Sequence, residues 1–421
     1  MTTHPGEGRA RRDGNTHTDI DTLPAMTMPR PVMPAGLPPA DADSTAHSRR
    51  VESYLLERMQ ASPDGFLPFE EWMAEALYAP GLGYYAAGNT KFGSGLPTGD
   101  FTTAPEMTPV FGQVLARQVA QILQSTGTNS VLEFGAGTGA LAAALIPALQ
   151  ALDIAVDYRI LELSADLKAR QAERLAFASE SMQWLDTLPD AFEGCVIGNE
   201  VLDAMPATLF RWSESGELME IGVKARPDGK PPFDWAERGA GPELQSAIPE
   251  RMPALPGYRS EINLQAEAWM RQMGSWLKTG AALLIDYGFP RREYYHPQRA
   301  TGTLMCHFRH HSHDQPLVLA GIQDITAHVD FTAMADAALE GGLEVLGYTT
   351  QARFLLNAGL PEIMQTQMAD PSSPTVQATL SAVQRLMSEA EMGELFKVLA
   401  VGRGVRLPLS GFVRGDRRDT L

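Results

Sequence analysis

Three glycines follow one apolar segment of the chain, and a carboxylate ends the next. Gly135, Gly137 and Gly139 stand in EFGAGTG, directly before a helical pattern, and Glu162 closes the following apolar segment. Glycine lets the backbone approach a ligand closely, and the first turn of a helix offers unpaired N–H groups. A carboxylate at the end of the second strand can accept hydrogen bonds from ribose hydroxyls. The spacing therefore predicts a site for a nucleotide-like cofactor.

This glycine pattern is shared by two classes of cofactor site. Residues 135–140 read GAGTGA, which also satisfies the rule for dinucleotide binding. Two details favour S-adenosyl-L-methionine: Glu133 lies two residues before Gly135, and the third glycine is at 139 rather than 140. An acid at 133 suits the α-ammonium group of that cofactor and is a poor neighbour for an anionic pyrophosphate. A tight turn that binds nothing is the remaining alternative.

Polar residues end the apolar segment CVIGNEVLDAMP. Ligands of open α/β sheets bind beyond the carboxyl ends of the strands, so we expect Asn199, Glu200 and Asp203 beside the cofactor. Two carboxylates can hold a guanidinium by charge-assisted hydrogen bonds and localise a nitrogen lone pair. A helix N-terminus, with Asn199 or Asp203 as its cap, explains the same residues equally well. Asp286 and Tyr287 end a later apolar segment and are expected at the same opening.

Four of the nine histidines fall within HFRHHSHD, residues 307–314. Their spacing matches no standard zinc site, so we predict no metal and interpret His307–His313 as a polar surface loop near the site. Asp324, His328 and Asp330 form a second polar cluster before a helical pattern. His328 is a candidate catalytic residue because the histidine pKa lies near about 6.5, although a capping or core role accounts for it equally.

These side chains need a sheet that gathers its strand ends at one edge. Short apolar segments alternate with amphipathic helical ones, as in a parallel sheet covered on both faces. We therefore predict an α/β fold with a mostly parallel sheet, and a late antiparallel strand is compatible with the spacing. Together with Glu133 and Glu162 around the glycine turn, this favours the class I (Rossmann-like) methyltransferase type. The expected strands are 130–134, 157–163, 182–185, 195–202, 281–288, 343–350 and 395–403, and the expected helices include 107–124, 138–152 and 164–177.

The chain also divides into segments of different composition. We expect a disordered N-terminal arm at 1–48, a helical lead-in with a cofactor-covering loop at 49–127, a methyltransferase domain at 128–405 and a tail at 406–421. A β-rich insertion is expected at about 205–270, between the fourth and fifth strands, with a hairpin around Gly216. The arm is assigned as disordered because it is rich in proline and offers little apolar surface to bury.

Composition limits the class of partner. The 421 residues carry a formal net charge of −17, which repels nucleic acid and attracts a cationic substrate. No apolar run approaches the ~20 residues that cross a bilayer, so we expect no membrane partner. The two cysteines, Cys195 and Cys306, form no CxxC pair, which suits a reducing compartment. Monomer and homodimer are both open.

Several segments together resemble the MidA family of S-adenosylmethionine-dependent methyltransferases. Mitochondrial members of that family are complex I assembly factors and protein arginine methyltransferases. The matching segments are GYYAAG (83–88), TGDFTTAPE (98–106) with FG at 111–112, EFGAGTG (133–139), ILELS (160–164), GNEVLDAMP (198–206), LLIDYG (283–288), GTL (302–304) and DITAHVDF (324–331). They run in family order, and GDFTTAPE followed by FG is far more specific than the glycine loop.

The resemblance implies a protein substrate that presents an arginine, with symmetric dimethylation as in the mitochondrial relatives. By position it implies that Gly135, Gly137 and Gly139 hold the cofactor, that Glu162 binds its ribose, and that Glu200 and Asp203 face the substrate. We infer in addition that Asp100, Thr103 and Glu106 cover the cofactor from the lead-in segment.

One feature departs from the mitochondrial relatives. Acidic residues lie among the arginines of the N-terminal arm, which therefore lacks clear import character. Together with an alanine- and proline-rich composition, this predicts a bacterial cytoplasmic member, with the mitochondrial matrix as the alternative. A small-molecule methyltransferase and a non-catalytic, cofactor-binding assembly chaperone are the alternative functions. The intact glycines and carboxylates argue against the chaperone.

Overall fold

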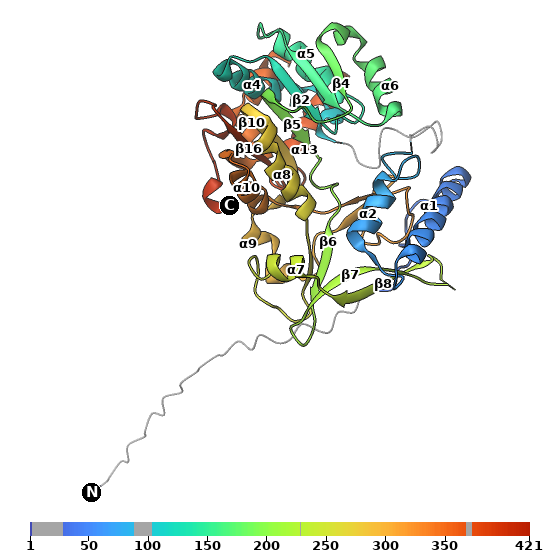
Figure 1. Ribbon diagram of the computed structural model, residues 1–421. Coiled ribbons are helices and arrows are strands. Elements are labelled where there is room, and N and C mark those ends of the chain that lie inside the picture. Colours follow the sequence, from blue (N-terminus) through green and yellow to red (C-terminus); the bar gives the residue numbers. More distant parts are fainter. Residues whose placement is uncertain (2–27, 88–102, 228, 368–372) are drawn as a thin grey trace.

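A mostly parallel β-sheet lies at the centre of the larger of two lobes (Figure 1). The computed structural model describes residues 1, 28–87, 103–227, 229–367 and 373–421. The strand order is β15-β16-β10-β5-β2-β3-β4, with β14 beside β10. The strands are β2 (Ser130–Phe134), β3 (Asp157–Leu161), β4 (Met182–Leu185), β5 (Phe192–Asn199), β10 (Leu277–Phe289), β14 (Val329–Asp330), β15 (Glu344–Thr350) and β16 (Phe396–Arg403).

The direction of the strands matches the class I pattern. Neighbouring strands from β4 to β10 run parallel, whereas β16 runs antiparallel to both β10 and β15. This confirms the predicted sheet with its late antiparallel strand. Because parallel neighbours end at the same edge, the carboxyl ends of β2 and β5 lie side by side.

Helices cover both faces of this sheet. Leu283 and Ile285 pack with the helices of one face, and Ala282 and Leu284 pack with those of the other, because alternate strand residues point to opposite sides. One face carries α4 (Pro109–Thr126) and α5 (Ala140–Gln150), and the other carries α8 (Leu264–Trp276) and α10 (Phe331–Glu340). The same lobe contains α3 (Ala104–Met107), α6 (Ala165–Arg174), η2 (Ala176–Ser181), α11 (Gln351–Asn357), α12 (Leu360–Gln367), α13 (Pro374–Met387), η4 (Ser410–Phe412) and η5 (Arg418–Thr420).

The second lobe, called the cover lobe below, is assembled from three separate parts of the chain. These are the lead-in, the insertion after β5, and a further insertion between β10 and α10 (Figure 1). Its elements are α1 (Ala42–Ala61), β1 (Leu67–Pro68), α2 (Phe69–Tyr78), β6 (Thr208–Trp212), β7 (Leu218–Ala225), β8 (Phe233–Gly239), α7 (Pro242–Ala247), β9 (Arg259–Ile262), α9 (Arg291–Tyr294), η3 (Pro297–Arg299), β11 (Met305–Phe308), β12 (His311–His313) and β13 (Asp324–Thr326). The hairpin β6–β7 around Gly216 is as predicted.

Two local expectations are wrong. Helix α1 begins at Ala42, within the segment 1–48 that was expected to be disordered, because the side chain of Asp41 accepts a hydrogen bond from the backbone N–H of Ser44 and caps it. Residues 42–48 are thus helical, whereas 2–27 of the expected disordered arm lie outside the described residues. The histidine stretch forms the strands β11 and β12 instead of a loop, since the two pair antiparallel. No helix of the described residues is long and apolar enough to span a membrane.

Candidate active site

The glycine turn after β2 has the backbone that its sequence requires. Gly135, Gly137 and Gly139 all adopt positive φ, at 63°, 53° and 83°. A Cβ added to Gly135 would lie 2.9 Å from the side chain of Val201, whereas one added to Gly137 would meet no atom within 4 Å. Gly137 therefore faces open space at the start of α5, as a cradle for a ligand demands.

A cavity of about 250 Å³ lies over this turn, between the two lobes. The sheet lobe lines it with Thr103, Glu106, Glu133, Gly135, Gly137, Asn199, Glu200, Asp203 and Tyr287, among others. The cover lobe adds Tyr84, Tyr85, His307 and Asp324. The structure thus gathers most of the predicted site residues into one pocket. Asp100 lies outside the described residues.

Glu133 is a buried carboxylate in the pocket wall. Its side chain accepts a 2.6 Å hydrogen bond from the hydroxyl of Tyr158, which the sequence did not reveal as a partner. Burial raises the pKa of Glu133 to about 7, although the Tyr158 hydrogen bond favours the charged form. A cationic group beside it would restore the charge, which fits the expected α-ammonium.

Glu162 stands beside the glycine turn but outside the pocket lining. It accepts a 3.2 Å hydrogen bond from the side-chain nitrogen of Gln171, which also donates to the carbonyl of Gly137 at 2.8 Å. Trp184 in turn donates to the side-chain oxygen of Gln171. The expected ribose acceptor is therefore placed next to the turn, and Gln171 links the two.

The lead-in segment reaches the glycine turn through α3. Glu106 accepts a hydrogen bond from the hydroxyl of Thr138 and forms a 2.9 Å ion pair with Arg174 of α6. Thr103 lies at the N-cap position of α3 and lines the pocket. Glu106 is thus held against the glycine turn and Thr103 lines the same pocket, whereas their covering of the cofactor stays a prediction.

The loop after β5 presents the acidic residues to the pocket. Residues 200–207 form bends and turns, so the expected alternative of a helix N-terminus here is wrong. Glu200 adopts φ 54°, a strained left-handed conformation for a residue with a side chain. Asn199 donates a 3.0 Å hydrogen bond to its carboxylate. Burial, and next the charge of Asp203, raise the pKa of Glu200 to about 8.

Asp286 has a different place from the one expected. Instead of lining the pocket, its carboxylate accepts hydrogen bonds from the backbone N–H groups of Val201, Leu202 and Asp203. It thereby fixes the loop that carries the other carboxylates. Burial, and next the charge of Asp286, raise the pKa of Asp203 well above its ordinary value.

His328 is not brought to this pocket. It lines a second, smaller cavity together with Arg251, Glu267 and Asp330, and its ring stacks on Phe289 with centroids 5.3 Å apart. Burial lowers its pKa to about 4. Its catalytic role stays a prediction.

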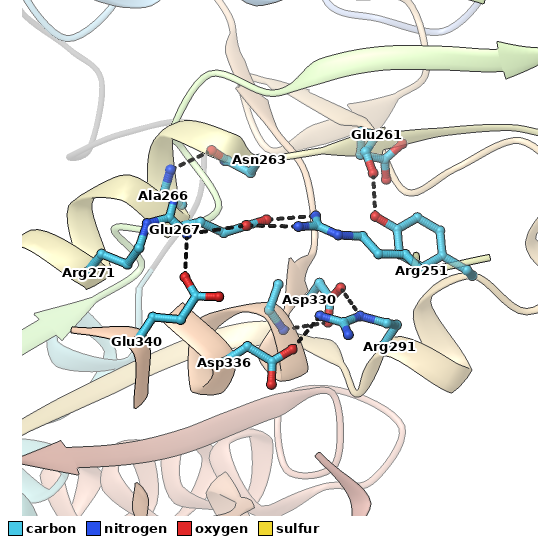
Figure 2. A network of polar contacts seen from close by, with 12 residues as sticks. Arg251, Glu261, Asn263, Ala266, Glu267, Arg271, Arg291, Asp330, Asp336 and Glu340 are labelled. Carbon is cyan, nitrogen blue, oxygen red and sulfur yellow. Dashed lines mark hydrogen bonds and ion pairs between the residues drawn. The ribbon is translucent and has the colours of Figure 1, made fainter. Parts of the chain in front are cut away.

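Ion pairs beside this second cavity join the two lobes. Figure 2 shows Arg251, from the cover lobe, in a two-pronged contact with Glu267 of α8, at 2.7 and 2.9 Å. Arg291 forms ion pairs with Asp330, the N-cap of α10, and with Asp336 within α10. Among the described residues, no group of three or more His, Cys, Asp or Glu side chains could hold a metal ion. The ion pairs of Arg251 and Arg291 tie the cover lobe to α8 and α10 beside this cavity.

The sequence patterns assign no function to the residues that the cover lobe contributes to the pocket. Tyr84 and Tyr85 stand in GYYAAG, His307 in the histidine stretch, and Asp324 in the second polar cluster. Nothing local marks them as neighbours. Their shared signal is that each falls in a segment matched by the family resemblance or in a dense polar cluster.

The strand order, the glycine turn after β2 and the acidic loop after β5 define a class I methyltransferase fold. A family of S-adenosyl-L-methionine-dependent methyltransferases matches residues 114–349, and the chain belongs to this MidA-type family. It is an S-adenosylmethionine-dependent methyltransferase.

Relatives agree with this assignment. A Burkholderia thailandensis protein crystallised with S-adenosyl-homocysteine is 46% identical, covers 91% of this chain and 100% of its own, and superposes with a TM-score of 0.85. Proteins named mitochondrial protein arginine methyltransferase NDUFAF7 are 28% identical in Danio rerio and 26% in Homo sapiens. These alignments cover 86% and 87% of this chain, and 89% and 86% of the relatives.

Proposed function

We propose that this chain methylates an arginine side chain of a protein substrate. The observation that carries the proposal is the acidic loop after β5, which points Glu200 and Asp203 into the cofactor pocket. A planar guanidinium can bond to carboxylates through several of its five N–H donors, and the positive charge offsets the carboxylates' burial. The names of the curated relatives support the same substrate class.

The residues present fit the cofactor. Gly137 offers open space at the start of α5, and the side-chain oxygen Oδ1 of Asn199 is buried without a partner among the described residues. Gly135, Gly137 and Asn199 would hold the cofactor, Glu133 would face its α-ammonium, and Glu162 would serve its ribose. When bound, S-adenosylmethionine supplies an electrophilic methyl group.

The carboxylates then act on the nucleophile. Glu200 and Asp203 accept hydrogen bonds from guanidinium N–H groups, which orients one nitrogen and localises its lone pair. Because its pKa is raised to about 8, Glu200 is also suited to receive a proton from that nitrogen. From the resemblance we expect symmetric dimethylation of a protein that joins a respiratory complex, in a bacterial cytoplasm or the mitochondrial matrix.

Transfer of labelled methyl from S-adenosylmethionine to an extract of a strain lacking this gene tests the proposal. Wild-type protein should label a discrete protein, and fragment-ion mass spectrometry should place the methyl groups on arginine. Glu200→Gln should lower transfer at least about 100-fold while binding S-adenosyl-homocysteine almost normally. Glu193→Gln removes an exposed carboxylate of β5, the strand that precedes Glu200, and is the matched control. Label on lysine or on a small molecule would refute the substrate class.

A further inference from the structure

Asp324 brings a carboxylate to the pocket from the lobe opposite Glu200. It is the first residue of β13, where it pairs in register with His307 of β11. Paired residues of neighbouring strands point to the same face, and both side chains line the pocket. The insertion between β10 and α10 thus builds part of the pocket wall.

Tyr85 fixes this carboxylate. Its hydroxyl donates a 2.7 Å hydrogen bond to Oδ1 of Asp324. The ring of Tyr85 stacks on Tyr78 with centroids 5.4 Å apart and meets Tyr84 edge-on at 5.0 Å. A short aromatic cluster from the lead-in therefore holds the donor in place.

Two further hydrogen bonds tie this unit to the acidic loop. The hydroxyl of Tyr78 donates to the carbonyl of Ala204 at 2.8 Å, and the backbone N–H of Ala327 donates to the carbonyl of Asp203 at 3.0 Å. The ends of β5 and β13 are thereby held at a fixed separation, although they belong to different lobes. The charge of Asp324 acts on both Glu200 and Asp203.

One buried carboxylate oxygen in this arrangement, Oδ1 of Asp203, has no hydrogen-bond donor among the described residues. Asp203 is only 5% exposed. A buried acceptor without a donor is costly, and Asp203 lines the pocket. A donor-rich, positively charged ligand would satisfy it.

We propose that Asp324 is a substrate-binding carboxylate, positioned by Tyr85, and that with Glu200 it makes the pocket prefer a guanidinium to an ammonium group. A guanidinium presents donors on several edges of one plane and can bridge carboxylates on two lobes. An ammonium directs its three donors from a single nitrogen, so it spans less of the distance between carboxylates on opposite lobes. This inference rests on the proposed function and adds the source of its selectivity.

Small probes test the preference directly. N-acetyl-L-arginine amide and N-acetyl-L-lysine amide are titrated calorimetrically into full-length protein saturated with S-adenosyl-homocysteine. Wild-type protein should bind the arginine probe more tightly. Asp324→Asn should weaken that probe at least about tenfold and the lysine probe less, so that the preference collapses. Asp314→Asn removes an exposed carboxylate next to the same small sheet and should change neither.

Tyr85→Phe keeps the ring packing and removes only the hydroxyl, so it also covers the case in which Asp324→Asn does not fold. It should raise the KM for the labelled extract protein about threefold to tenfold and leave kcat within about twofold. Cofactor binding and unfolding temperature are measured on each variant.

The outcomes separate the two proposals. If wild-type protein methylates arginine while Asp324→Asn keeps the full preference for the arginine probe and Tyr85→Phe leaves KM unchanged, this inference is overturned and the proposed function stands. If wild-type protein transfers no methyl group to arginine, both are overturned. If Asp324→Asn loses the preference for the arginine probe and still binds the cofactor, the inference about Asp324 is supported.

Discussion

The carboxylate oxygen Oδ2 of Asp286 lies 2.9 Å from the backbone nitrogen of Leu202 and accepts its hydrogen bond. The same oxygen accepts from Val201 and Asp203, each at 3.2 Å. One side chain near the carboxyl end of β10 thus organises the loop that follows β5. This explains how Glu200 can be held in a strained backbone conformation: the following residues are tied down.

Replacing Asp286 should therefore lower the free energy of unfolding and release the acidic loop from its present conformation. Asp286→Ala leaves three backbone donors without an acceptor, so we expect a loss of about 3 kcal/mol or more in the free energy of unfolding. Urea denaturation measures this. Asp336→Ala removes a half-exposed partner of Arg291 and should cost about 0–1 kcal/mol. Equal losses for the two variants would contradict the role of Asp286.

Cofactor binding should depend on pH through Glu133. Because burial raises its pKa to about 7, the group is protonated and neutral at pH 6 and becomes a carboxylate as the pH rises through 7. Only the carboxylate attracts an α-ammonium group. Affinity for S-adenosyl-homocysteine should thus rise about fivefold to tenfold from pH 6 to 7.5. Glu133→Gln should flatten the profile, and an unchanged profile in this variant would argue against the contact.

The rate of methyl transfer should show a separate pH limb. The pKa of Glu200 is raised to about 8, so the carboxylate that accepts guanidinium hydrogen bonds becomes available as the pH rises through that value. We expect kcat/KM to increase from pH 6.5 to 8.5. Asp203→Asn removes the neighbouring negative charge and should move the midpoint of this limb to lower pH. A midpoint that stays in place in this variant would show that another group sets it.

The glycine turn offers a matched pair of substitutions. Gly137 and Gly127 both adopt positive φ, and an added Cβ meets no atom within 4 Å at either position. Each alanine variant should therefore lose about 1–2 kcal/mol of stability from backbone strain. Only Gly137→Ala should weaken S-adenosyl-homocysteine binding, at least about tenfold, because Gly127 lies at the end of α4, outside the pocket lining. Similar cofactor affinities in both variants would contradict the placement.

His328 can be tested without disturbing its packing. His328→Phe keeps a ring between Tyr287 and Phe289, where the histidine now packs. Since His328 lies outside the pocket lining and has a pKa near 4, we expect methyl transfer within about twofold of wild type. A fall of more than about tenfold, at unchanged stability, would instead support the catalytic role considered from the sequence.

Much of the cofactor side could be predicted because its signals are local. Gly135 and Gly137 need positive φ, and that requirement is visible as glycine wherever the turn occurs. The apolar strands and their helices follow from periodicity within single segments. The start of α1 was misplaced since a cap at Asp41 outweighed the polar composition around it.

The substrate side depends on contacts that no local pattern encodes. Tyr85 and Asp324 are joined by a hydrogen bond between residues 239 positions apart in the chain. Asp286 and Tyr287 are adjacent, yet Tyr287 lines the pocket while Asp286 binds the loop, because consecutive strand residues face opposite sides. His328 illustrates the same point, since it lies between β13 and β14 and lines a different cavity.

The class of sheet, the cofactor turn and the polar end of the fourth strand could be predicted from the sequence alone, since each depends on the backbone requirements or the apolar period of one continuous segment. Whether that polar end forms a loop or the start of a helix, and which carboxylates meet there, depends on the tertiary structure. The lead-in and the later insertion pack as one cover lobe over the pocket and so place Asp324 with Glu200. Side-chain orientation and long-range packing are properties of the whole fold, and they add substrate-binding residues to the cofactor-binding turn.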